Sequence, residues 1–98
     1  MPVVMHMQWN DVTPHQYDEL RHCVDLEQPV PPRPGLHLAW FTDTGLNIVE
    51  LWTAAEDFQA YLDHRFMPAA VKAGLPDEPT ITVSPAHSVV GSTDETGG

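Results

Sequence analysis

The sequence predicts an α+β fold in which one antiparallel sheet of four strands carries two helices on a single face. Three observations lead to this prediction. Four short segments alternate apolar and polar residues with the period of a strand, and two longer segments show the caps and the apolar spacing of helices. The six segments follow one another in the order strand, helix, strand, strand, helix, strand. A chain of 98 residues has room for one such domain, which we expect over residues 1–90.

The first strand is expected over residues 2–9, where large apolar side chains occupy every second position. The first helix begins after Thr13, which can cap it, with a proline in the first helical position and Gln16 completing a capping box. It runs to about Leu26. At about 100° per residue, its buried stripe consists of Tyr17, Leu20 and Val24, with Cys23 at the margin.

A proline-rich stretch over residues 29–35 follows the first helix and cannot itself be helical. The second strand is expected over residues 36–41 and the third over residues 46–52. A turn over residues 42–45 separates these two strands, so they are predicted to form a hairpin.

The second helix is predicted from a second capping box, Thr53-Ala-Ala-Glu56. It runs to about residue 66 or 67. Pro68 then restarts or kinks it, because proline cannot donate the helical hydrogen bond, and Gly74 ends it.

The last strand is expected over residues 80–90, and residues 91–98 form a small polar tail that should be disordered. The complete order is the split βαβ, or ferredoxin-like, arrangement. In it the two helices cover only one face of the sheet, yet the strands look apolar on both faces. An exposed apolar face of this extent needs a partner, so we expect a homodimer that packs sheet against sheet.

The charge balance is strongly acidic. Fourteen Asp and Glu residues oppose four Lys and Arg residues, which gives a formal net charge of −10. Such a surface repels phosphate backbones and anionic lipid, so we expect neither a nucleic-acid partner nor a membrane partner. No apolar run could span a bilayer and the first residues lack the features of a signal peptide. The single cysteine, Cys23, excludes an internal disulfide and fits the reducing cytoplasm, where we expect the protein to be.

The second helix places an arginine on the stripe that should be buried. Helical spacing puts Phe58, Tyr61 and Arg65 on one face. Burying an arginine is costly unless its charge is answered, so Arg65 is a candidate anchor for an anionic or enolate oxygen of a substrate. The alternatives are an ion pair with Glu50 and a side chain that reaches solvent along its methylene groups. Tyr61 could donate a hydrogen bond to the same ligand, or it could be an ordinary residue at the edge of the core.

Three histidines lie in predicted strands that are otherwise apolar. Imidazole titrates near neutral pH, so His37 or His87 could act as a general base, and His6 could contact a substrate. For each, the alternative is a half-buried histidine whose hydrogen bonds are satisfied. Glu50 could orient a histidine or pair with Arg65. The aromatic residues that would supply apolar walls are Trp40, Trp52 and Phe58.

One polar stripe has a spacing that metal sites use. His15, Asp18 and His22 share a face of the first helix, but this is the solvent side opposite the buried stripe, and a solvated face is the expectation. Zinc-ligand motifs, phosphate-binding loops and nucleophile elbows are absent from the sequence. We therefore predict no metal and no other cofactor.

Several of these residues also occur together in known proteins. The segment from Ile48 to Trp52, followed by Glu56, Phe58 and Tyr61, resembles the dimeric α+β barrel superfamily and, within it, the antibiotic-biosynthesis-monooxygenase-like proteins. The resemblance covers residues 2–90. Small bacterial members are similar at further positions, namely Gly35, Leu36, His37, Gly45, Trp52, Arg65, Pro68, Pro85 and His87.

The resemblance implies a dimeric α+β barrel and a choice of activities. Members that oxidise anthrone-type phenols need no metal or flavin, because the substrate carbanion reacts with oxygen directly, while the protein supplies a base, a hydrogen-bonding cradle and an apolar cavity. We therefore expect a cofactor-independent monooxygenase-like enzyme that acts on an aromatic or polyketide-like small molecule. His37 or His87 would be the base, and Arg65 and Tyr61 would hold the oxyanion.

Two alternatives stay open. Cyclase members of the superfamily use a histidine base with a tyrosine, so a polyketide cyclase or isomerase would use the same parts without oxygen. A non-enzymatic dimeric module that binds a small molecule is the other alternative. Haem degradation is not expected, because the haem-degrading branch has a histidine ten residues after the position of Tyr61 and this chain has Val71 there.

Overall fold

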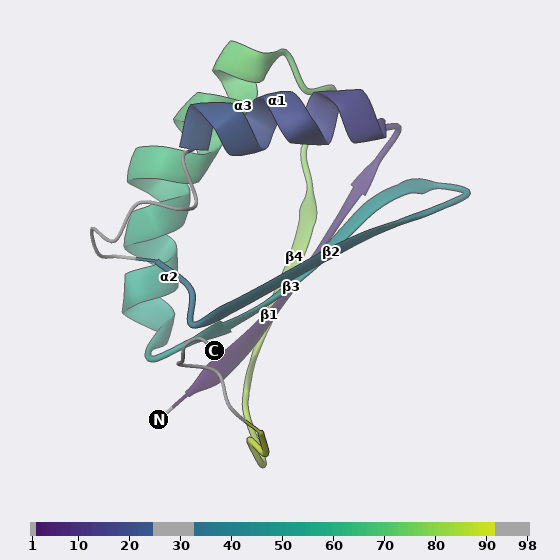
Figure 1. The fold of residues 1–98 in the computed structure, drawn as a ribbon. Helices are drawn as coiled ribbons and strands as arrows, with labels where there is room; N and C mark the ends of the chain where they lie inside the picture. The colour runs from purple at the N-terminus through teal and green to yellow at the C-terminus, as the bar shows by residue number, and fades with distance from the viewer. Residues whose placement is uncertain (1, 25–32, 92–98) are drawn as a thin grey trace.

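The computed structural model describes residues 2–24 and 33–91, and Figure 1 shows their arrangement. The helices lie on one side of a four-stranded antiparallel sheet whose strand order is β2-β3-β1-β4. The α+β, ferredoxin-like fold is thereby confirmed. The strands are β1 (Val3–Asn10), β2 (Leu36–Thr42), β3 (Gly45–Trp52) and β4 (Thr80–Pro85); the helices are α1 (Pro14–Val24), α2 (Ala55–Tyr61) and α3 (Met67–Ala73), with a π-helical turn, η1 (Leu62–Phe66), between the last two.

The strand register gives the sheet two different faces. Residues paired across strands share a face, so Met5, its partner Glu50 and the partner of Glu50 on the other side, His37, all point toward the helices. We call this side the helix face and the opposite side the open face. The second set of pairs, such as His6 with Val49 and Val49 with Leu38, lies on the open face.

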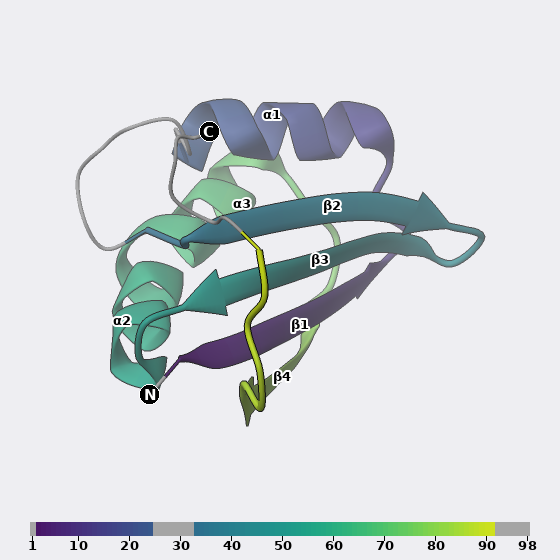
Figure 2. The ribbon, with the colours of Figure 1, turned by 60° about the horizontal axis from the view of Figure 1, so that its bottom comes forward.

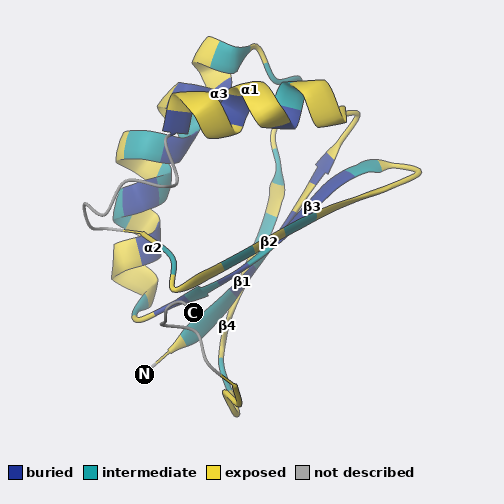
Figure 3. Ribbon diagram, in the orientation of Figure 1, coloured by how far each residue is buried: buried dark blue, intermediate teal, exposed yellow. Residues whose placement is uncertain are grey.

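The core fills the space between the helix face and the helices, and Figure 3 shows buried segments on both layers. Trp9, Trp52 and Tyr61 are among its largest fully buried side chains. The indole N–H of Trp9 donates to the carbonyl of Pro76, so this polar group is satisfied inside the core. The core therefore combines aromatic packing with a few polar groups, and most of those polar groups belong to the site described below.

The start of α1 forms as its sequence predicts. The Thr13 hydroxyl accepts a hydrogen bond from the backbone N–H of Gln16 at 3.2 Å, and the Gln16 side-chain oxygen accepts one from the backbone N–H of Thr13 at 2.9 Å. This reciprocal capping box is confirmed. The predicted stripe of Tyr17, Leu20 and Val24 is buried. Residues 25–32, which include the predicted end of this helix and most of the proline-rich stretch, lie outside the described residues.

The second helix begins differently from its prediction. The N-cap residue is Ala54 rather than Thr53, and no side chain caps it, so the capping box predicted from Thr53 to Glu56 is wrong. Ala54 has the extended backbone of a cap, and its carbonyl accepts from the N–H of Phe58. Thr53 is one residue too early for its hydroxyl to reach the first free N–H groups of the helix.

Pro68 widens the second helix. Its ring would clash with the carbonyl of His64, four residues earlier, and it has no N–H to donate. The preceding turn is η1, where the N–H of Met67 donates to the carbonyl of Leu62, five residues back. The helix then continues as α3 and ends at Gly74, whose left-handed backbone (φ 76°) makes it the predicted C-cap.

The last strand is shorter than predicted. β4 ends at Pro85 rather than at residue 90, because proline has no N–H for the ladder with β1. Ala86 still donates its N–H to the carbonyl of Pro2, and the chain beyond it then crosses the open face, as Figure 2 shows. Val89 from this segment borders a hollow of about 260 Å³ together with Gly35 and Leu51. The disorder predicted for the tail concerns residues that, from 92 on, lie outside the described part of the chain.

Among the residues that the structure describes, no helix is both long enough and apolar enough to cross a membrane.

Candidate functional site

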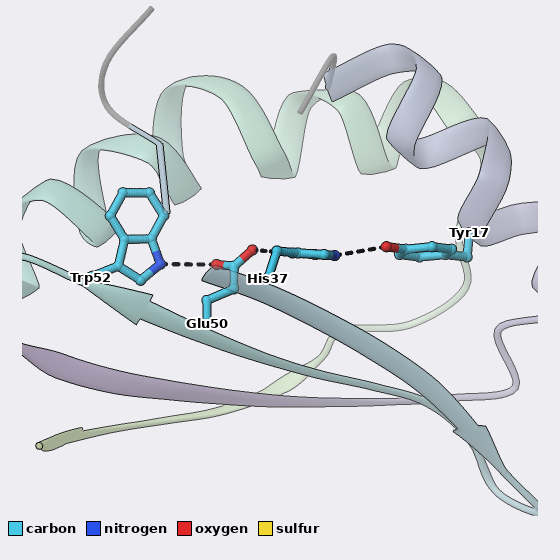
Figure 4. A network of polar contacts seen from close by, with 4 residues as sticks. All are labelled: Tyr17, His37, Glu50 and Trp52. Atoms are coloured by element: carbon cyan, nitrogen blue, oxygen red, sulfur yellow. Dashed lines mark hydrogen bonds and ion pairs between the residues drawn. The ribbon is translucent and has the colours of Figure 1, made fainter. Parts of the chain in front are cut away.

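A chain of four polar side chains runs across the core, and Figure 4 shows it from close by. The Trp52 indole N–H donates to Glu50 Oε1 at 2.9 Å. The other carboxylate oxygen, Oε2, lies 2.6 Å from His37 Nδ1. The second ring nitrogen of His37, Nε2, lies 2.7 Å from the Tyr17 hydroxyl. Three elements, β3, β2 and α1, thus contribute to one continuous set of hydrogen bonds.

The register of the sheet explains how Glu50 and His37 meet. They are direct partners on β3 and β2, and both point to the helix face. Trp52 lies two residues after Glu50 and therefore on the same face of β3. Tyr17 reaches the imidazole from the buried stripe of α1, and its ring lies nearly parallel to that of His37, with 12° between the ring planes and 6.2 Å between the centroids. The chain therefore connects a helix to the sheet.

Burial makes this arrangement specific. The Glu50 side chain is 2% exposed and that of His37 is 18% exposed. A buried carboxylate needs donors for both oxygens, and here Trp52 and His37 supply them. With His37 neutral, Nδ1–H donates to Glu50, so Nε2 has the lone pair and accepts from the Tyr17 hydroxyl. Glu50 thus fixes the imidazole tautomer that has its basic nitrogen directed toward Tyr17.

Tyr61 is buried beside this chain with an unsatisfied hydroxyl. Its ring packs on Trp52, and its oxygen has no hydrogen-bond partner among the residues that the structure describes, although the residue is 1% exposed. Burial raises the pKa of Tyr61 far above its usual value near 10; the charge of Glu50 and the proximity of Tyr17 add to the rise, and the charge of Arg65 opposes it. The hydroxyl therefore keeps its proton and can act only as a donor or a neutral acceptor.

The Arg65 side chain, which comes from η1, contacts the last residue of α1 rather than Glu50. Its guanidinium donates to the carbonyl of Val24 at 3.4 Å, and its Cζ stands 5.6 Å from the centroid of the Tyr61 ring. Both oxygens of Glu50 are bonded to His37 and Trp52 instead. The sequence left an ion pair between Arg65 and Glu50 as one alternative. The described contacts of Arg65 are instead a helix carbonyl and the face of an aromatic ring.

The other candidate residues fall on different sides of the sheet. Trp52 and Phe58 form an edge-to-face pair in the core, next to Tyr61. His6 and Trp40 stack on the open face, where the His6 imidazole lies 3.3 Å from the side-chain oxygen of Asn47. His87 is exposed in the segment after β4. The structure thus brings His37, Glu50, Trp52, Phe58 and Tyr61 together and leaves His6, Trp40 and His87 outside this group.

Tyr17 is the residue of the site that the sequence analysis missed, because helical spacing accounted for it as a core residue. A signal was present, since a buried tyrosine hydroxyl needs a hydrogen-bond partner and the sequence offered histidines for it. Finding that partner required the register that points His37 inward.

The possible metal stripe of the first helix stays on the surface. His15, Asp18 and His22 are all exposed on α1. In the part of the chain that the structure describes, no group of three or more His, Cys, Asp or Glu side chains is arranged to hold a metal ion.

Comparisons with known proteins identify structural neighbours at low sequence identity. No family model matches the chain, and no curated protein matches it. A dimeric ferredoxin-like protein of unknown function from Thermobifida fusca is 19% identical, with a TM-score of 0.56 over 85% of this chain and 90% of that one. A protein from Chloroflexus aurantiacus, described as a "putative antibiotic biosynthesis monooxygenase", is 18% identical, with a TM-score of 0.50 over 92% of this chain and 98% of that one. At these identities the likeness establishes the ferredoxin-like α+β fold that the chain shares with both proteins.

Proposed function

We propose that this protein is a homodimeric, cofactor-independent enzyme that removes a proton from an aromatic or polyketide-like small molecule, with His37 as the base. The observation that carries the proposal is the hydrogen-bonded order Tyr17–His37–Glu50 inside the core. A buried carboxylate that orients an imidazole, whose other nitrogen meets a hydroxyl, is the arrangement that activates a general base. The monooxygenase-like name of one structural neighbour fits this class of chemistry.

Each residue has a separate role in the proposed proton transfer. Glu50 holds the Nδ1–H of His37 and stabilises the imidazolium that forms. Tyr17 relays the proton: its oxygen takes the proton from an acidic C–H or O–H of the substrate while its own proton moves to His37 Nε2. This use of a histidine together with a tyrosine fits the cyclase-like proteins that the sequence resembles.

Tyr61 is proposed to hold the oxyanion that this proton transfer creates. Its hydroxyl is protonated, is buried and has no partner within residues 2–24 and 33–91, so an oxygen of the substrate would satisfy it. Arg65 acts through it, because a cation over the ring withdraws charge and makes the hydroxyl a stronger donor. Trp52 and Phe58 supply the adjoining apolar wall.

Oxygen enters as a co-substrate in the leading form of the proposal. The carbanion at a CH₂ group adds dioxygen to give a hydroperoxide, and loss of water leaves a carbonyl. One oxygen atom stays on the substrate, the other leaves as water, and the substrate supplies the electrons, so the reaction needs no metal or flavin. A cyclase or isomerase would use the same proton transfer and stop before oxygen is consumed.

A second candidate is a non-enzymatic dimeric module. One observation favours it: both ring nitrogens of His37 already have hydrogen-bond partners within the protein, Tyr17 and Glu50. In that case the four side chains serve to fix α1 on the sheet, and their removal would change stability alone.

The experiment begins with a thermal-shift screen of phenolic and polyketide-like compounds, followed by oxygen-uptake measurements on every compound that stabilises the protein. His37→Gln, which cannot accept the proton, should lower turnover by about 10²–10⁴-fold while the protein stays folded. His87→Gln, at an exposed histidine, is the matched control and should keep the activity. Turnover that survives in His37→Gln contradicts the assignment of the base, and turnover without oxygen uptake selects the cyclase or isomerase.

A further inference from the structure

His6 lies in the middle of the open face. It belongs to β1, an inner strand of the sheet, and its direct partners are Val49 of β3 and Thr82 of β4. Its imidazole is half-buried and lies nearly parallel to the Trp40 indole, with 13° between the ring planes and 6.1 Å between the centroids. A partner that covers this face therefore also covers His6.

A short set of hydrogen bonds fixes the His6 ring. Asn47, which is 5% exposed, donates from its side-chain nitrogen to the Thr42 hydroxyl at 3.5 Å, so its side-chain oxygen is directed toward His6. That oxygen lies 3.3 Å from His6 Nε2. An amide oxygen only accepts, so Nε2 has the hydrogen and, in the neutral ring, Nδ1 has the lone pair. Protonation at Nδ1 therefore adds a positive charge and leaves the bond to Asn47 in place.

His6 is the one ionisable residue among the strand positions of the open face, all of which the structure describes. The side chains next to it on this face, Val49, Thr82 and Trp40, offer no negative charge. The described part of the segment after β4, which crosses this face in Figure 2, adds one more titratable group, the exposed His87. A positive charge on His6 thus has no carboxylate facing it from these strands or from residues 86–91.

We propose that two copies of the chain associate through the open face only while His6 is neutral, so that acidification dissociates the dimer. The inference rests on the homodimer of the proposed function and adds its control by pH. In a free subunit a protonated imidazole is hydrated. In a face-to-face dimer it would be buried between uncharged sheets about 10 Å apart, together with the same charge from the second copy.

The sign of the pH dependence follows from this difference. The dimer disfavours the proton that the free subunit can take up, so association is complete while the imidazole is neutral. It is lost as the pH falls through the range in which imidazole groups titrate. Each dissociating dimer then takes up two protons, one for each copy of His6.

This direction is opposite to the one that the overall charge predicts. The chain has a formal net charge of −10 at pH 7 and a pI near 4.6, so acidification lowers the repulsion between two copies. On charge alone, association should therefore become stronger at lower pH. Weaker association at lower pH requires a group whose protonation the interface disfavours, and His6 is placed to be that group.

Sedimentation over a range of concentrations, at constant ionic strength and at pH values from about 7.5 to about 5.5, measures the dissociation constant. Imidazole groups are half protonated near pH 6.5, so two protons per dimer should raise the constant by up to about 100-fold over this range. His6→Gln keeps an N–H for Asn47, cannot be charged and should remove the rise. His6→Phe keeps an aromatic ring beside Trp40, and its dissociation constant should likewise be independent of His6 protonation.

Two control variants should retain the full rise. His22→Gln removes an exposed histidine of α1, on the helical side of the molecule. The double variant Asp94→Asn, Glu95→Gln removes both carboxylates of the last residues of the chain, so a retained rise excludes them as its source.

The possible results separate this inference from the homodimer itself. A rise that persists in both His6→Gln and His6→Phe, or that only His87→Gln removes, overturns the assignment to His6. A dissociation constant that is unchanged or falls on acidification overturns the pH control and leaves the homodimer intact. A parent protein that is monomeric at every pH overturns both.

Discussion

The chain has two tyrosines, and the core places them in opposite situations. The Tyr17 hydroxyl is hydrogen-bonded to His37 at 2.7 Å, whereas the Tyr61 hydroxyl is buried and has no partner in the described part of the chain. An unsatisfied buried hydroxyl costs about 1–3 kcal/mol, while a satisfied one contributes about 1 kcal/mol. We therefore predict that Tyr61→Phe raises the free energy of unfolding by about 1 kcal/mol and that Tyr17→Phe lowers it by a similar amount, as measured by urea denaturation.

The two variants serve as controls for each other, because each removes one oxygen from a buried ring. Alkaline pH gives a second readout. The raised pKa of Tyr61 means that its contribution to stability is complete below about pH 10, where unfolded tyrosine is protonated, and is lost as the pH rises further. Tyr61→Phe should remove part of that alkaline loss. A stabilised Tyr61→Phe protein that also loses turnover would indicate that the unsatisfied hydroxyl is kept for a ligand.

Single residues of the site could be predicted only as far as residue type and spacing allow. His37, Glu50, Trp52, Phe58 and Tyr61 were candidates from the sequence, and they do lie together. Their pairing could not be predicted, because moving β2 by one residue against β3 would turn His37 to the open face. Glu50 illustrates the point: the sequence left both a histidine and Arg65 as its partner, and the register decides for His37.

At the scale of the elements, the turn between β2 and β3 depends on one glycine. Gly45 has a φ of 145°, and a Cβ there would lie 2.8 Å from the backbone nitrogen of Asp11 and closer still to the carbonyl oxygen of Trp9. Neither backbone atom can move without disturbing β1. Gly45→Ala should therefore destabilise the protein by about 2–4 kcal/mol, which thermal or chemical denaturation will detect.

Gly35→Ala is the matched control. Gly35 precedes β2, has no positive φ, and its added Cβ would meet only the carbonyl oxygen of Leu51 at 3.7 Å, an ordinary contact. Its effect should stay within about 0.5 kcal/mol. Equal effects of the two substitutions would mean that the hairpin tolerates rearrangement and that the close approach at Gly45 does not constrain it.

Elements were predictable where local rules act alone, and less so where tertiary contacts intervene. The Thr13–Gln16 capping box and the Gly74 C-cap are decided within a few residues, and both formed as predicted. The cap of the second helix is Ala54, two residues after β3 ends at Trp52, and not Thr53 as the local capping pattern predicts. β4 stopped at Pro85, a residue whose missing N–H was visible in the sequence but was outweighed there by the alternation of apolar residues.

For the whole molecule, charge is distributed unevenly between the faces of the sheet. The register places no Asp, Glu, Lys or Arg of β1–β4 on the open face, although the chain has a net charge of −10. Instead it exposes large apolar side chains: Leu38 is 52% exposed, Trp40 43% and Leu36 41%. Two copies with such a net charge repel each other wherever acidic surfaces meet, so this uncharged face is where they can approach.

We accordingly predict that Leu38→Glu prevents dimerisation. In a sheet-to-sheet dimer the substitution would place one carboxylate from each subunit in an uncharged interface, at a cost of several kcal/mol, so the dissociation constant should rise by at least about 100-fold. Sedimentation over a range of concentrations should give a dimer of the 10.9 kDa chain for the parent protein and a monomer for the variant.

Val71→Glu adds the same charge on α3, where Val71 is 77% exposed on the helical side, and should remain dimeric. A dimer that tolerates Leu38→Glu and is broken by Val71→Glu would assign the interface to the helices, and a parent protein that is monomeric at every concentration would leave the open face without the partner proposed for it.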